Sequence, residues 1–428
     1  MGQAVNRKIV TRLGVLLLVA ACMPVNAQAQ SVWNLERVLQ TAMANHPLVL
    51  GRRLAEDAAR SDKDGAEWQR FPSLSLQANS YNGYNNDNNN AIVNNDAGTG
   101  LVRIDQPLWA GGRITAGIDA ANSRLDAASA AVEEARQDLR LRVIGAITEA
   151  LRQKERQQHG EAGVKEHEKL LAMIQRRVAQ EVSPLADERL AAARLYATAN
   201  DLSATKQALN NALAQLSQLV GQTVKVVSES GLDTAGTPAS VESALDQGVA
   251  YSPTLKRLAF EEETAIADIA TKRAVYMPQL VVLYENSTVG NVNEKRAMLV
   301  LTVQPGAGLS ALSGVDSAEA RRESARMTRE AAERDTRERI MLNWNEWEEA
   351  RLRLENANQA RAMSAEVSES YSRQYMVGRK SWLDVMNAVR EYTQSELTVD
   401  DARAQMLAVS LRLRALTGTL QAKTGDQP

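Results

Sequence analysis

Apolar residues recur along much of the chain at the spacing of a long helix. Between residues 114 and 139 they are separated alternately by four and three positions, the heptad spacing of a coiled coil. No proline occurs between Pro107 and Pro184, so the chain can form one helix of about 70 residues, about 105 Å long at about 1.5 Å per residue. The residues of this seam are Ile114, Ile118, Ala121, Leu125, Ala128, Val132, Ala135 and Leu139, and a seven-residue spacing returns at Leu195, Leu202, Leu209 and Leu216.

Turn signals divide the helical stretches at equivalent places in the two halves of the chain. Ser183 is suited to cap a new helix that has Pro184 at its first position. In the second half, Gly378 is suited to end one helix and Ser381 to cap the next. The pattern therefore predicts two long antiparallel helical hairpins.

Two other segments show the alternation of apolar and polar residues that is typical of strands. In the first, residues 73–78 alternate serine or glutamine with leucine or alanine, residues 79–95 form a polar loop rich in asparagine, and a second strand ends at Pro107. In the second, strands are expected at residues 279–287 and 297–303. Each pair of strands predicts a β-hairpin.

The two halves of the chain share one layout. The dipeptides His46-Pro47 and Phe71-Pro72 each have a counterpart 206 positions later, at Ser252-Pro253 and Met277-Pro278. We interpret this as a tandem duplication in which each copy contains a helix, a β-hairpin and a long helical hairpin. The first repeat is expected at residues 30–221, with a β-hairpin at about 73–106 and a helical hairpin at about 113–220. The second repeat is expected at 239–420, with a β-hairpin at about 279–304 and a helical hairpin at about 315–418. A linker at 222–238 joins the two repeats, and a flexible tail follows at 421–428.

The composition fits a mainly helical, elongated assembly better than globular domains. Aromatic residues make up only 4% of the 428 residues, whereas a globular core normally uses aromatic side chains as bulk. The single cysteine excludes a disulfide framework, and the formal charge of −2 argues against nucleic-acid binding. His159 and His167 lie in a helix rich in lysine and glutamate, without the spacing of a metal site. We find no catalytic, metal or cofactor pattern, so the sequence predicts that the protein is not an enzyme.

The first residues have the pattern of an export signal. A basic stretch that ends at Arg12 precedes an apolar stretch too short to span a bilayer, and the small residues before Ala27 and Ala29 suit cleavage there. Residues 1–29 are therefore predicted to be a signal peptide, and their removal would change the formal charge from −2 to −5. A second interpretation stays open, because the residues up to Cys22 resemble a lipobox in which Cys22 would be acylated.

Four strands in an exported chain pose a problem of closure. Strands of about 8–10 residues are long enough to cross an outer membrane at a tilt. Four strands cannot close a barrel, however, and open strand edges are not tolerated in lipid. The simplest solution is that several copies of the chain share one barrel under cyclic symmetry, with the helices continuing it as a tube.

The sequence resembles the TolC family of outer-membrane efflux and secretion channels over about residues 33–420. The resemblance is carried by the duplicated start, by residues 103–113 (Arg-Ile-Asp-Gln-Pro-Leu-Trp-Ala-Gly-Gly-Arg) and above all by residues 375–388 (Tyr-Met-Val-Gly-Arg-Lys-Ser-Trp-Leu-Asp-Val-Met-Asn-Ala). It implies a homotrimer in the outer membrane of a Gram-negative bacterium. Four strands from each chain would form a 12-stranded barrel, continued into the periplasm by an α-helical barrel.

The resemblance also indicates a functional tip. In the family, the turn of the second helical hairpin carries acidic residues that ring the closed end of the channel, and Asp384 falls on the first of two such positions. Asn387 occupies the second, which halves the expected negative charge. Tyr375 and Lys380 fall on positions that hold the tip shut, where lysine lacks the bidentate fork of arginine. Asp384 also reads as part of a capping box with Ser381, so a purely structural role stays open.

Within the family the chain looks most like LapE/AggA-type members, which serve type I secretion of large adhesins. The predicted function is therefore the exit duct of a tripartite export system, working with a periplasmic adaptor and an inner-membrane ABC transporter or other pump. An outer-membrane component of a multidrug efflux pump is the first alternative. A periplasmic coiled-coil adaptor or structural protein without a pore is the alternative from another class.

Overall fold

The computed structural model describes residues 32–83, 95–230, 232, 236–289, 292–304 and 310–420. The predicted signal peptide at 1–29, with Cys22, and the predicted tail at 421–428 lie outside the described residues.

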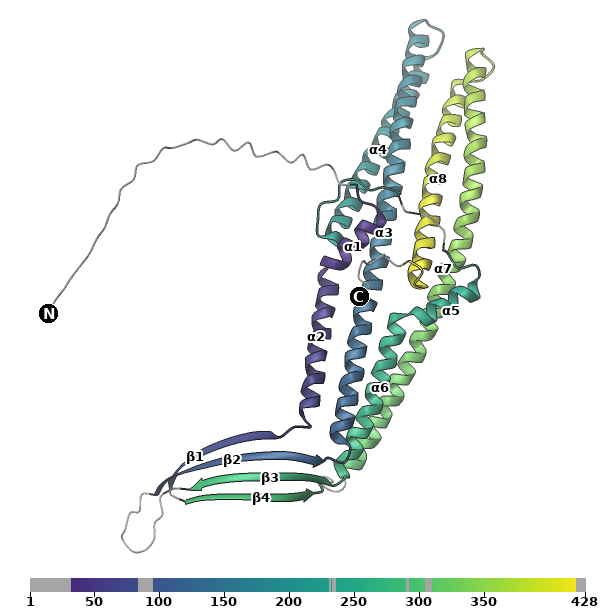
Figure 1. Cartoon of the computed structure of the whole chain (residues 1–428). Coiled ribbons are helices and arrows are strands. Elements are labelled where there is room, and N and C mark those ends of the chain that lie inside the picture. Colours follow the sequence, from purple (N-terminus) through teal and green to yellow (C-terminus); the bar gives the residue numbers. More distant parts are fainter. Residues whose placement is uncertain are drawn as a thin grey trace, which may run out of the picture.

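The chain is elongated, with a sheet at one end and long helices running away from it (Figure 1). The same order of elements, two helices, two strands and two long helices, occurs twice. The first set is α1 (Leu35–Asn45), α2 (Pro47–Trp68), β1 (Ser73–Gly83), β2 (Asn95–Trp109), α3 (Arg113–Ala179) and α4 (Leu185–Val220). The second set is α5 (Val241–Tyr251), α6 (Pro253–Arg273) with a following 3-10 turn η1 (Ala274–Tyr276), β3 (Gln279–Val289), β4 (Val292–Thr302), α7 (Ser310–Met376) and α8 (Trp382–Leu416).

Two helices, α3 and α7, run through the whole helical part. Each has 67 residues, which corresponds to about 100 Å at about 1.5 Å per residue. Near the sheet, α3 packs against α2 and α6, and farther away it packs against α4 and α8. Helix α7 likewise packs first against α6 and then against α8. The prediction of a mainly helical fold with a small antiparallel sheet is confirmed.

The largest apolar cluster lies at the level of α1, which we call the waist. It is formed by side chains of α1, α3, α4 and α8 together with the segment that joins the two halves of the chain. That segment is held by the backbone of Trp33, which donates to the carbonyl of Val226 at 3.0 Å and accepts from the amide of Ser228 at 2.9 Å. The waist therefore connects both helical hairpins to the inter-repeat linker.

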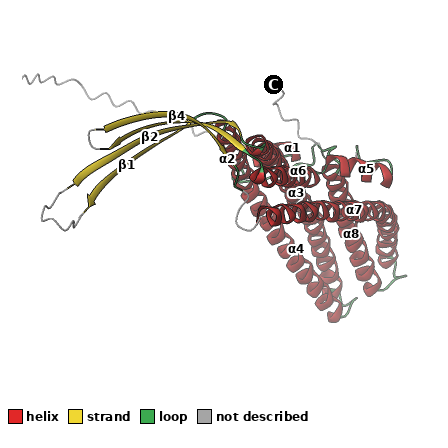
Figure 2. Cartoon of the chain, turned by 90° about the horizontal axis from the view of Figure 1, so that it is seen from below, coloured by secondary structure: helices red, strands yellow, loops and turns green. Residues whose placement is uncertain are grey.

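The sheet has the order β1-β2-β3-β4, with each neighbouring pair antiparallel. It projects from the end of the helical part as one curved layer (Figure 2). The register places Ser75, Arg103, Glu285 and Arg296 side by side across one face. The opposite face carries Leu74, Leu76, Val102, Ile104, Val282, Tyr284, Leu299 and Leu301. The first face therefore carries most of the charged side chains of the sheet, interspersed with Leu101, Val281, Leu283, Met298 and Val300, whereas the second is mainly apolar.

Two expectations about the first β-hairpin need correction. Strand β1 continues to Gly83, into the segment expected to be a polar loop at 79–95, because ladder hydrogen bonds use backbone groups whatever the side chains are. Strand β2 continues through Pro107 to Trp109 instead of ending there. Pro107 is tolerated because β1 already ends opposite Asp105, and because the pairing with β3 shifts register between Pro107 and Trp109.

The predicted cap of α4 is also wrong. The helix begins at Leu185 with Pro184 as its N-cap, and no side chain caps it. The hydroxyl of Ser183 instead accepts a hydrogen bond of 3.4 Å from Nε of Arg177 on α3. Ser381 does cap α8, as the sequence predicts. None of the described helices is both long and apolar enough to cross a membrane.

Candidate functional site at the tip of the helical hairpins

The turns of both helical hairpins lie at the end of the molecule far from the sheet (Figure 1). An apolar cluster just below these turns joins the two hairpins. Helices α3 and α4 contribute Leu170, Ile174 and Ala191, and α7 and α8 contribute Tyr375, Trp382, Val385, Met386 and Val389. The tip of one chain is therefore a packed four-helix unit rather than two free hairpins.

Tyr375 lies inside this cluster with only 6% of its surface exposed. Its ring centroid is 5.4 Å from that of Trp382, and the guanidinium carbon of Arg177 lies 4.9 Å from the tyrosine ring. Arg177 belongs to α3, so a cation–π contact crosses from the first hairpin to the second. The hydroxyl oxygen of Tyr375 is buried and has no hydrogen-bond partner among the described residues. The ring, and not the hydroxyl, makes the link between hairpins.

Lys380 makes a different contact from Tyr375. Its Nζ atom lies 4.1 Å from the ring of Tyr371, which belongs to α7 of the same hairpin. Within one chain, Lys380 therefore stabilises its own turn rather than joining the two hairpins.

Asp384 forms the predicted capping box with Ser381. The amide of Asp384 donates to the Ser381 hydroxyl at 3.2 Å, and the amide and hydroxyl of Ser381 donate to Oδ2 of Asp384 at 3.1 and 2.8 Å. These hydrogen bonds, first from the hydroxyl and then from the amide, lower the pKa of Asp384, and the charge of Lys380 adds to the effect. Asp384 therefore remains an anion at neutral pH while it caps the helix. Asn387 is exposed one turn further along α8.

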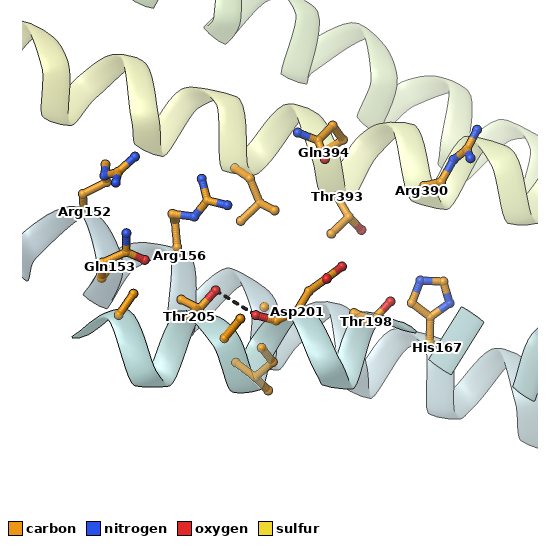
Figure 3. A pocket seen from close by; sticks show the side chains of 15 residues that line it. Arg152, Gln153, Arg156, His167, Thr198, Asp201, Thr205, Arg390, Thr393 and Gln394 are labelled. Carbon is orange, nitrogen blue, oxygen red and sulfur yellow. Dashed lines mark hydrogen bonds between the residues drawn. The ribbon is translucent and has the colours of Figure 1, made fainter. Parts of the chain in front are cut away.

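A polar cleft of about 570 Å³ lies between α3, α4 and α8, on the waist side of the tip cluster (Figure 3). Arg152, Arg156 and His167 line it from α3, Asp201 and Thr205 from α4, and Arg390 and Gln394 from α8. The hydroxyl of Thr205 donates to the carbonyl of Asp201 at 3.0 Å. Helix α8 lies close to α3 here, since a Cβ atom at Gly163 would lie 3.4 Å from Cγ2 of Thr393, within van der Waals contact.

The structure places both histidines of α3 against other helices. His167 is 4% exposed, and burial lowers its pKa. His159 lies with Nδ1 at 2.7 Å from Oδ2 of the buried Asp400 on α8. The burial of His167 and the contact of His159 with Asp400 depend on α4 and α8 lying beside α3, which no local pattern reveals. Among the described residues, no group of three or more His, Cys, Asp or Glu side chains could hold a metal ion.

Comparison with known proteins identifies the class. The family model described as outer membrane efflux protein matches residues 38–222 and 244–419, so the chain belongs to that family. The fold resembles that of CusC, with a TM-score of 0.81 and 16% sequence identity over 90% of this chain and 91% of CusC. It also resembles the outer membrane protein VceC from Vibrio cholerae, with a TM-score of 0.76 and 17% identity over 90% and 96% of the two chains.

A third similar structure is the outer membrane channel MtrE from Neisseria gonorrhoeae in its open state. The TM-score is 0.76, with 16% identity over 90% of this chain and 88% of MtrE. A search of curated proteins finds no match. The protein is thus an outer-membrane efflux channel of the TolC type, which disfavours the alternative of a periplasmic adaptor without a pore. Its family consists of transport channels rather than enzymes.

Proposed function

We propose that three copies of the chain form one duct, with a shared 12-stranded barrel in the outer membrane and a helical tube in the periplasm. The observation that carries this proposal is the sheet. Among the described residues, its outer strands β1 and β4 each pair along one edge only, and its two faces differ in polarity. An apolar face toward lipid and a polar face toward a lumen are the pattern of membrane barrels, and closure removes the open edges.

The helices offer a second reason for assembly. Helix α7 exposes a series of large apolar side chains along its length: Leu312, Met327, Met341, Leu342, Leu352, Met363 and Val367. Apolar surface of this extent is unfavourable in water, and a neighbouring copy would cover it. The internal duplication fits such a tube, because two copies of one helical unit per chain would give six similar units around the axis.

The tip is the proposed gate of the duct. Three copies of Asp384 around the axis would form a ring of anions, which would favour cations over anions. The contact of Arg177 with Tyr375 would hold the two hairpins of each chain together in the closed state. Lys380, bound to Tyr371 within one chain, would be available to a neighbouring copy only after leaving that ring.

The exposed apolar side chains of the tip indicate where a partner protein would bind. Val182, Leu185, Met376, Val377 and Leu383 are all more than half exposed at the two turns. We propose that a periplasmic adaptor covers these side chains and links the duct to an inner-membrane ABC transporter or other pump. Type I secretion of a large protein such as an adhesin is the cargo that we favour, from the resemblance of residues 375–388 to LapE/AggA-type members. Efflux of drugs or other small molecules is the second candidate, because the matching family model is described as outer membrane efflux protein.

The duct is tested with the full-length protein purified from outer membranes. We expect a trimer that resists detergent and separates into monomers on heating, and single-channel conductance in planar bilayers. Recovery only as a soluble periplasmic protein, or as a monomer without conductance, would contradict the proposal. Cargo is tested in a deletion strain: loss of a large surface protein with unchanged drug susceptibility supports secretion, and the reverse result supports efflux.

A further inference from the structure

At the waist, the inter-repeat linker meets α3 and α8 around a small cavity. The cavity has a volume of about 270 Å³ and is lined by Glu155 of α3, Glu229 and Leu232 of the linker, and Arg403 and Leu407 of α8. Three segments far apart in the sequence therefore bring two carboxyl groups together with the guanidinium of Arg403, and Arg152 of α3 also lines the cavity. Figure 1 shows the linker crossing beside α3 and α8 at this level.

Arg403 bridges the two glutamates. Its Nη1 atom is 3.4 Å from Oε1 of Glu155, and its Nη2 atom donates to Oε2 of Glu229 at 3.1 Å. One guanidinium therefore holds the two carboxyl groups beside each other, where a hydrogen bond between them would raise the pKa of Glu155. Two carboxyl groups can hydrogen-bond to each other only when one of them carries a proton.

The surrounding charges leave that proton on Glu155. Burial, followed by hydrogen bonding with Glu229, raises the pKa of Glu155 to about 7 against the opposing charge of Arg403. The pKa of Glu229 is lowered, because it accepts the hydrogen bond from Glu155 and lies near Arg403 and Lys154. Protonated Glu155 is thus the donor and ionised Glu229 the acceptor.

Other titratable and charged groups near Glu155 are engaged in separate pairs. On α8, Asp400 binds Nδ1 of His159 at 2.7 Å, and its pKa is raised by burial. Asp401 on α8 accepts hydrogen bonds from Arg156 at 2.7 Å and from Arg152 at 3.2 Å. From the neighbourhood of the linker, Nζ of Lys154 donates to the carbonyl of Val227 at 3.0 Å. Glu155 is therefore the group through which a proton directly controls the attachment of the linker.

We propose that Glu155, Glu229 and Arg403 form a proton-dependent clamp, which holds the inter-repeat linker against α3 and α8 while one proton lies between the two carboxyl groups. Above neutral pH the proton leaves, two carboxylates face each other across one arginine, and the linker loosens. The direction follows from linkage: a raised pKa of Glu155 contributes stability that is complete below its ordinary pKa of 4.5 and is lost as pH rises through about 7.

The proposed consequence for the duct rests on the proposed function. The linker lies against both α3 and α8, so its release would remove one restraint on movement of the α7–α8 hairpin relative to the α3–α4 hairpin. The clamp would then be tightest in mildly acidic conditions, and the channel would open more easily in mildly alkaline ones.

The test measures the linker itself, in the full-length assembled protein. Hydrogen exchange of the amides at residues 224–230 is followed by mass spectrometry between pH 6 and pH 8 and expressed as protection relative to the unfolded chain. We expect protection to fall about tenfold over this range, the factor that linkage gives for a pKa moved from 4.5 to about 7. In Glu155→Gln the amide still donates to Glu229 but cannot titrate, so protection should stay constant.

A matched control separates the clamp from the neighbouring histidine pair. His159→Gln removes the imidazole that contacts Asp400 and keeps the Glu155 side chain, so the pH dependence should persist. If the dependence survives in Glu155→Gln, or disappears in His159→Gln, the proposal is wrong. Glu229→Gln gives an independent check, because losing the acceptor carboxylate should move the transition to lower pH. The exchange measurement needs no conductance, so a protein that fails to form pores would refute the proposed duct without affecting the clamp.

Discussion

At the scale of single residues, two tip side chains combine roles that the sequence alone leaves separate. Asp384 is both a partner of Ser381 in the capping box of α8 and a partly exposed anion, because its hydrogen bonds with Ser381 stabilise its charged form. Tyr375 is a core residue whose ring carries a contact between hairpins. For each position, two substitutions can separate the two roles.

For Asp384, replacement by asparagine removes the charge but keeps an oxygen that can cap the helix. We expect Asp384→Asn to reduce cation preference in bilayer recordings with little loss of thermal stability, and Asp384→Ala to reduce both. The reciprocal variant Asn387→Asp should increase cation preference. Unchanged ion selectivity in all three variants would mean that the ring of anions does not exist.

For Tyr375, replacement by phenylalanine keeps the ring and removes a buried hydroxyl that has no partner among the described residues. We expect Tyr375→Phe to unfold at the temperature of the natural protein or slightly above it, because an unsatisfied buried polar group is unfavourable. Tyr375→Ala should lose about 3 kcal/mol, the usual cost of removing a buried aromatic ring. Thermal unfolding followed by near-ultraviolet circular dichroism measures both. Equal destabilisation by the two variants would show that the hydroxyl matters.

At the scale of elements, the sequence predicts type and approximate position better than ends and neighbours. Heptad spacing indicates α3, and Ser381 with Asp384 indicates the start of α8, because these signals are local. The continuation of β2 through Pro107 could not be seen, since it depends on β1 ending opposite Asp105 and on the shift of register against β3. The burial of His167 likewise depends on helices α4 and α8, which are distant in sequence.

A pair of glycines tests how closely the helices pack. A Cβ atom at Gly248 of α5 would lie 2.2 Å from Cδ1 of Ile340 on α7, whereas one at Gly145 of α3 would meet nothing within 4 Å. We expect Gly248→Ala to lower the free energy of unfolding by about 1–3 kcal/mol through overpacking. Gly145→Ala should raise it by up to about 1 kcal/mol through helix propensity. Denaturant titration distinguishes the two, and a stabilising Gly248→Ala would contradict the observed packing of α5 on α7.

At the scale of the whole molecule, a single chain exposes strand edges and apolar surface that a neighbouring copy would cover. In the part of the chain that the structure describes, the outer strands of the sheet each pair along one edge only, the two faces of the sheet differ in polarity, and α7 exposes apolar side chains along its length. These features lead to the proposed trimer, but the number of copies comes from the family resemblance.

Two neighbouring residues of β4 provide a direct test of which face of the sheet is turned toward lipid. Leu299 lies on the apolar face of the sheet, and Met298, its neighbour in sequence, lies on the polar face with Arg296. We expect Leu299→Arg to oppose insertion by about 2–4 kcal/mol at the centre of the bilayer. Met298→Arg should be tolerated in the lumen. The yield of heat-modifiable trimer in outer membranes measures the difference, and equal yields would contradict the assignment of the faces.

The sequence by itself determined the features that follow from neighbouring residues: long heptad helices, alternating strands, the cap at Ser381 and the repeated layout of the two halves. Its pattern specifies which face of an element is apolar, but not which other element covers that face. Only the tertiary structure decided that Arg177 lies on the ring of Tyr375, and that Arg403 joins Glu155 to Glu229. These contacts link residues from different helical hairpins and the linker, so their positions are set by the packing of long helices at the tip and waist.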